Sequence, residues 1–186
     1  MRRPLAAAAL LVGLAACSAG GEYDRTRSDW ETANSARIAK ESDPLEAPLP
    51  GPLNRASLAE FFVSSASDFR FFVDTSAIAV TPDGLVRYVL VARSPAGAEN
   101  VTYEVLSCRG QEYRVYGSAR ADGSWARLNT PWRPLGPRAP AQRILTREYF
   151  CPSRIAIASP QEGAEALRRG GHALAAPPHP VSGGGK

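Results

Sequence analysis

The middle of the chain alternates apolar and polar side chains with a period of two residues. Residues 101–105 and 113–115 show this alternation, which is typical of strands with one buried face. Residues 85–92 are apolar on nearly both sides and predict a central strand. Further strands are expected at residues 69–74, 77–80 and 125–128.

The segments between these strands carry the residues that tight turns require. Pro, Asp and Gly occur together at residues 81–84, 94–97 and 121–124, and an Arg-Gly pair occupies residues 109–110. Such residues preset or permit the backbone angles of short reversals. We therefore predict an antiparallel β-meander of four to six strands.

Helix signals lie at the two ends of this predicted sheet. Ser159, Pro160 and Glu162 form a capping pattern, and Gly170 supplies a stop, which predicts a helix over residues 160–169. Residues 141–149 fit either a helix or the end of a strand, and residues 57–62 give a weaker helix signal. The expected fold class is α+β, with the sheet dominant and one or two C-terminal helices.

The N-terminus has the layout of a lipoprotein signal peptide. Arg2 and Arg3 precede an apolar run over residues 5–14, which is shorter than the roughly 20 residues of a membrane-spanning helix. The sequence Leu14-Ala15-Ala16-Cys17 resembles a lipobox, so we expect cleavage of residues 1–16 and lipidation of Cys17. Ordinary secretion is the alternative. Ser18, rather than Asp, follows Cys17, which resembles the sorting pattern of outer-membrane lipoproteins. We therefore expect the protein to be anchored in the outer membrane and to face the periplasm.

Two cysteines remain once Cys17 is assigned to lipid. Cys108 and Cys151 are then an even pair in an oxidising compartment, where a disulfide is expected. The sequence predicts no metal site, because neither cysteine belongs to a close CxxC pair and both histidines, His172 and His179, fall in the C-terminal tail.

Composition divides the remaining chain into three parts. Residues 17–44 are polar and read as a lipidated, flexible tether. Residues 45–171 form one domain that begins in a proline-rich stretch. Residues 172–186 are predicted to be a disordered tail rich in Pro and Gly.

Catalytic motifs are missing from the sequence. No GxSxG, HExxH, phosphate loop or dinucleotide turn occurs, so no cofactor is expected. A pair of carboxylates drawn from Asp74, Glu104 and Glu148 could still hydrolyse a glycosidic bond if two of them shared a cleft. The sequence brings no two of them together.

Arginine and aromatic residues supply the candidate binding groups. Of 22 basic residues only Lys40 and Lys186 are lysine, and the chain without Arg2 and Arg3 has 20 basic against 18 acidic side chains. This balance does not indicate a nucleic-acid partner. Guanidinium groups suit anionic envelope polymers, and aromatic rings suit sugars or peptides. The candidate binding residues are Arg87, Arg114, Trp125 and Trp132, with ordinary surface and core roles as the alternative.

Several separated motifs resemble one family. They are Phe71-Phe72-Val73-Asp74, Asp83-Gly84-Leu85-Val86-Arg87-Tyr88, the stretch 94–101, Asp122-Gly123-Ser124-Trp125 and Arg147-Glu148-Tyr149-Phe150-Cys151-Pro152. Their order and spacing resemble the CNP-one-like family of small proteobacterial envelope proteins, with a weaker likeness to secreted domains of the surface-adhesin E type. The resemblance implies an envelope location, a disulfide and one domain, and it implies no activity.

Two hypotheses for function follow. In the first, the chain is a non-catalytic envelope module that is tethered to the membrane by lipid on Cys17. It binds an envelope protein, a lipid headgroup or an anionic polymer. In the second, it is a hydrolase of envelope polysaccharide or peptidoglycan that acts through paired carboxylates.

Overall fold

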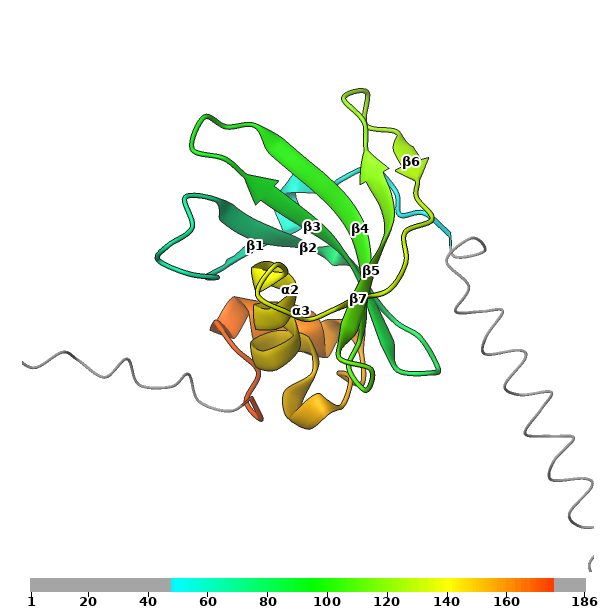
Figure 1. Cartoon of the computed structure of the whole chain (residues 1–186), viewed down its shortest axis with the longest axis vertical. Coiled ribbons are helices and arrows are strands. Elements are labelled where there is room, and N and C mark those ends of the chain that lie inside the picture. Colours follow the sequence, from blue (N-terminus) through cyan, green and yellow to red (C-terminus); the bar gives the residue numbers. More distant parts are fainter. Residues whose placement is uncertain (1–47, 176–186) are drawn as a thin grey trace, which may run out of the picture. The chain divides into compact units, whose positions relative to one another are not determined.

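The computed structural model describes residues 48–175, so the signal peptide, the whole tether with Cys17, and residues 176–186 lie outside the described residues. Within them the fold is α+β, as predicted, with an antiparallel sheet and helices after it (Figure 1). The strands are β1 (Leu58–Phe61), β2 (Arg70–Val80), β3 (Leu85–Arg93), β4 (Glu99–Ser107), β5 (Glu112–Ala119), β6 (Trp125–Arg127) and β7 (Arg133–Pro134). The helical elements are η1 (Arg55–Ser57), α2 (Pro140–Ile144), η2 (Leu145–Phe150), η3 (Pro152–Arg154) and α3 (Pro160–Arg169).

The sheet follows chain order from β1 to β6, with β7 pairing to β5 beside β6. This is the predicted meander, and glycines with positive φ sit in three of its turns, at Gly84, Gly97 and Gly123. Only glycine adopts this left-handed backbone without strain. In the fourth turn Gln111 takes the left-handed conformation, with φ 54°.

One predicted element is wrong. Residues 57–62 were expected to form a short helix, but Leu58–Phe61 is strand β1 and its register pairs Leu58 with Asp74 and Phe61 with Phe71. Phe61 and Phe62 lie three and four residues after Leu58, which fits one face of a helix. A helix here would leave the backbone groups at the edge of β2 unpaired, whereas strand β1 pairs with them.

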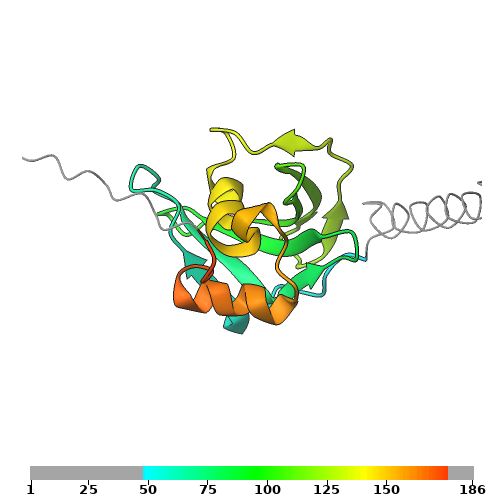
Figure 2. The same ribbon diagram turned by 90° about the horizontal axis from the view of Figure 1, so that it is seen from below.

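Helices cover one face of the sheet (Figure 2). Tyr88 and Leu106 from the strands pack there with Leu145 and Phe150, all fully buried. The ambiguous stretch 141–149 is helical, and α3 has the predicted ends: the Ser159 hydroxyl accepts a hydrogen bond from the Glu162 amide, and Gly170 is left-handed.

The opposite face is covered by the chain that leads into the sheet. Val89, Tyr103, Val105 and Tyr116 form a buried cluster there, against which Leu49 and other N-terminal residues pack. The central strands are therefore enclosed on both sides, which explains why β3 is apolar on nearly both faces.

Candidate functional site

The two candidate tryptophans pack on the second face of the sheet. Trp125 is half-buried, its ring lies 6.3 Å from that of Tyr103, and its Nε1 donates to the Gly51 carbonyl over 3.2 Å. Trp132 is half-buried against the same cluster. Both rings thus contribute to the layer that holds the N-terminal segment on the sheet.

The two candidate arginines belong to the same layer. Arg87 is buried, with its guanidinium carbon 5.8 Å from the centre of the Tyr116 ring. Arg114 donates from Nη2 to the Asn129 amide oxygen over 2.6 Å. Burial raises the pKa of both Tyr103 and Tyr116, which keeps these phenols neutral next to the guanidiniums.

Asp74 is a buried carboxylate on the second face. It accepts hydrogen bonds from the Asn54 amide (2.9 Å) and from the hydroxyls of Ser57 (2.5 Å) and Ser76 (2.6 Å). Burial raises the pKa of Asp74, but these hydrogen bonds together lower it by more, so the pKa falls below the ordinary value. Asp74 thereby fixes η1 and β1 against β2.

Glu104 is a buried carboxyl on the helix-covered face. Its Oε2 accepts from the Tyr88 hydroxyl (2.8 Å) and the Gln142 amide (2.9 Å), and its Oε1 accepts from Thr102 (2.7 Å). Burial raises the pKa of Glu104 above its usual range, and the three hydrogen bonds only oppose this shift. The group links α2 to the sheet.

These carboxylates do not share a cleft. Asp74 lies opposite Val89, which lies opposite Tyr103, so the next residue, Glu104, projects from the other face of the sheet. Glu148, on η2, pairs with Arg147. None of the three lines the cavities of about 340, 500 and 550 Å³ within residues 48–175. Within these residues, the geometry therefore places no two of Asp74, Glu104 and Glu148 at one of these cavities.

Some arginines on and beside the sheet, and both arginines at the end of α3, pair with acids. Glu99 binds both Arg55 and Arg93, each at 2.8 Å. Arg70 pairs with Glu60, and Arg168 and Arg169 both pair with Glu165. These pairs form the mixed-charge surface that is ordinary for a small domain.

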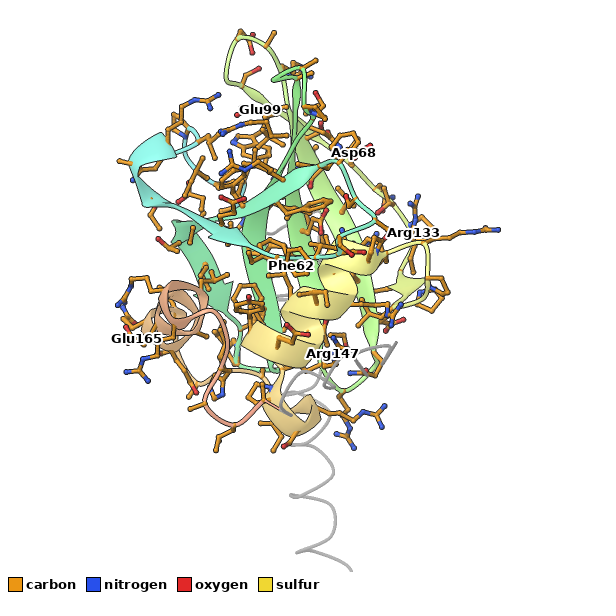
Figure 3. The ribbon with its side chains drawn as sticks, turned by 90° about the vertical axis from the view of Figure 1, so that its left-hand side faces the viewer. Phe62, Asp68, Glu99, Arg133, Arg147 and Glu165 are labelled. Carbon is orange, nitrogen blue, oxygen red and sulfur yellow. A yellow bond between two sulfur atoms is a disulfide. The ribbon has the colours of Figure 1, made fainter. Side chains whose placement is uncertain are left out.

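Five exposed arginines between β7 and η3 break this pattern, and we call them the basic surface: Arg133, Arg138, Arg143, Arg147 and Arg154. Glu148 is the one acidic residue in residues 133–154, and it pairs with Arg147. Figure 3 shows Arg133 projecting outward and Arg147 on the helix below it. Net positive charge is thus concentrated on one segment.

Two cavities are lined by residues of this segment, one near its start and one near its end. One, of about 340 Å³, is lined by Arg143, Arg147 and Arg154 together with Leu135. The other, of about 550 Å³, is lined by Arg133, Arg138, Tyr113 and neighbouring prolines and glycine. Arg143, Arg147 and Arg154 are not among the binding residues predicted from the sequence. The near-absence of acidic residues from 133–154 is the signal that could have indicated them.

The predicted disulfide is present and borders the smaller cavity. Cys108 and Cys151 are bonded, with 5.4 Å between their Cα atoms, and join the end of β4 to the end of η2. Cys151 itself lines the cavity. The cross-link therefore fixes one wall of this cavity to the sheet.

Residues 48–175 contain neither a cluster of metal ligands nor a membrane-spanning helix. No group of three or more His, Cys, Asp or Glu residues there could hold a metal ion. No helix in the same residues is long and apolar enough to cross a membrane.

Comparisons with known proteins agree with the resemblance seen in the motifs. The model described as the CNP1-like family matches residues 38–168. Cryptic neisserial protein 1 from Neisseria gonorrhoeae (strain ATCC 700825 / FA 1090) is 30% identical over 97 residues, which cover 44% of this chain and 48% of the relative. The match thus spans about half of the relative's length, and its source indicates a bacterial protein. No solved structure matches the chain.

Proposed function

The chain belongs to the CNP1-like family, and on that premise we propose that it is a cell-envelope lipoprotein with a non-catalytic binding role. Lipid on Cys17 would hold it at the outer membrane, facing the periplasm. Its domain would bind an anionic envelope polymer, or the acidic surface of an envelope protein, through the basic surface.

The uneven pairing of arginines carries this proposal. Arg55, Arg70, Arg93, Arg168 and Arg169 have carboxylate partners. No ion pair joins Arg133, Arg138, Arg143 or Arg154 to an acid within residues 48–175, and one acidic residue stands among them in the sequence 133–154. Concentrated positive charge raises the local concentration and association rate of anionic partners. Guanidinium groups are well suited to carboxylate and phosphate groups, because their donors are planar and paired.

The compartment is supported by the cysteines. A disulfide between two buried cysteines persists in oxidising spaces such as the periplasm and is rare in the cytosol. The signal-peptide layout and the lipobox before Cys17 agree with that compartment. Replacing Cys17 with Ala should release the protein from the membrane fraction and abolish incorporation of labelled fatty acid. The anchor would be contradicted if the Cys17→Ala variant stayed in the membrane fraction and the wild type incorporated no labelled fatty acid.

The binding role can be tested by photo-crosslinking in intact cells. A photo-reactive amino acid is placed at position 138 in the basic surface or at position 168 on α3, both of which are exposed arginines in the native chain. Position 138 should give discrete crosslinked products that are lost when Arg133 and Arg143 are changed to Gln, and position 168 should not. Equal products at both positions, or none at 138, would refute the proposal.

A further inference from the structure

The smaller cavity in the basic surface combines positive charge with a small volume that is open to solvent. We call it the arginine pocket: Gln111, Leu135, Arg143, Thr146, Arg147, Cys151, Ser153 and Arg154, about 340 Å³. No carboxylate lines it. Its volume lies at the lower end of the range for small-molecule sites, about 300 to 1,000 Å³. A compact anionic group therefore fits it better than a long polymer segment.

Backbone strain is concentrated at the arginine pocket. Three non-glycine residues within 48–175 have positive φ, namely Gln111 (54°), Ser153 (54°) and Arg154 (65°), and all three line this pocket. Each such residue destabilises the fold, and such residues gather at ligand-binding sites. The surrounding structure holds them in place, because the disulfide joins the two strained turns through Cys108 and Cys151.

The helix that forms one wall is irregular as well. Residues Leu145–Phe150 form a π-helical turn, closed by a hydrogen bond from the Cys151 amide to the Thr146 carbonyl over 3.0 Å. Such turns are rare in proteins, and those that do occur are often found at functional sites. In addition, Arg143 and Arg147 are four residues apart on this helical wall, a spacing that places two side chains near one another. Arg147 also pairs with Glu148, so Arg143 is the one of the two without a carboxylate partner in residues 48–175.

The donors around the arginine pocket suit phosphate. Arg143 and Arg147 come from the helix wall and Arg154 from the turn at η3, so guanidinium groups reach the cavity from two elements. A planar carboxylate is bound by a single arginine through two parallel hydrogen bonds. A tetrahedral phosphate has enough oxygens to accept hydrogen bonds from several guanidinium groups and from the Ser153 hydroxyl.

From these features we infer that the arginine pocket binds a single phosphate group, either free or as the headgroup of a lipid. This inference goes beyond the proposed function, because it assigns a second and more compact ligand to one cavity of the basic surface. Arg143, Arg147 and Arg154 contact the phosphate oxygens, and the π-helical turn and the disulfide hold these contacts in position.

Calorimetry on the full chain tests this inference. Inorganic phosphate is titrated first, at constant ionic strength. Vesicles of phosphatidylcholine with and without phosphatidic acid then distinguish a lipid headgroup from the free ion. Arg143→Gln and Arg154→Gln should each weaken phosphate binding about tenfold or more. The control Arg168→Gln removes the same charge from α3 and should leave affinity unchanged.

A further variant separates binding from folding. Arg154→Gly removes the guanidinium while relieving the positive φ, so it should lose phosphate affinity and raise the melting temperature. If neither phosphate nor the phosphatidic acid vesicles bind, or if affinity is the same in Arg143→Gln, Arg154→Gln and the wild type, the inference is wrong. Crosslinking at position 138 would then still decide the proposed function independently.

Discussion

The Cys108–Cys151 disulfide should supply a large part of the stability of the domain. It closes a loop with a sequence separation of 43 residues, and the chain-entropy relation gives about 4 kcal/mol for a loop of that length at 25 °C. Both cysteines are almost fully buried, so Ala is the better replacement, because Ser would place a hydroxyl in the core. For a domain of this size, each kcal/mol shifts the melting temperature by about 3 to 5 °C. The double variant Cys108→Ala/Cys151→Ala should therefore melt roughly 10 to 20 °C lower.

Calorimetric melting with and without reductant measures this effect. Wild type and variant both carry Cys17→Ala, so that reductant acts on this one pair alone. Reduction should bring the melting temperature of the wild type close to that of the double variant and leave the double variant unchanged. A difference below about 1 kcal/mol between the oxidised wild type and the double variant would refute the reasoning, since loop closure then adds little.

Three further predictions concern buried groups, and urea unfolding measures each. The raised pKa of Glu104 means that its contribution to stability is fully present below about pH 4.3 and is lost as pH rises through the folded-state pKa. Glu104→Gln should remove this pH-dependent loss, and stability curves against pH that run parallel for variant and wild type would contradict it. The lowered pKa of Asp74 means that its carboxylate stabilises the fold above about pH 3.9 and that this contribution is lost as pH falls. Asp74→Asn should destabilise by about 1 to 3 kcal/mol at neutral pH, and an unchanged midpoint would show that the hydrogen bonds carry no net stability. Gly163→Ala would place Cβ 2.6 Å from Ile157 Cδ1 and 3.2 Å from Phe150 Cε1, so it should destabilise by about 1 to 3 kcal/mol; a more stable variant would mean that the core relaxes freely.

Most of the sheet could be predicted because its signals are local. Alternation identified the strands, glycines identified the turns, and a cap with a glycine stop identified α3. Strand β1 was missed because its apolar spacing fits a helix as well as a strand, and only pairing with β2 decides between them. That pairing is a long-range property which a local pattern cannot contain.

The candidate binding residues show a different limit of sequence reasoning. Arg87 lies in a strand whose other residues are mostly apolar, and its guanidinium made it a candidate binding group. In the structure the N-terminal segment and Tyr116 lie on its face of the sheet, and Arg87 is buried. The basic surface was missed for a related reason: its arginines follow no single helical or strand period, and the tertiary fold gathers them.

The burial of both sheet faces also bears on where a ligand can bind. Helices cover one face and the N-terminal segment covers the other, so a ligand for the central strands would have to displace packed core. The segment from β7 to η3 has exposed charge, strained backbone and a cavity, and the disulfide holds its far end to β4. A fold retains backbone strain where the rest of the structure stabilises it. These features single out the basic surface, rather than a sheet face, as the place to test for binding first.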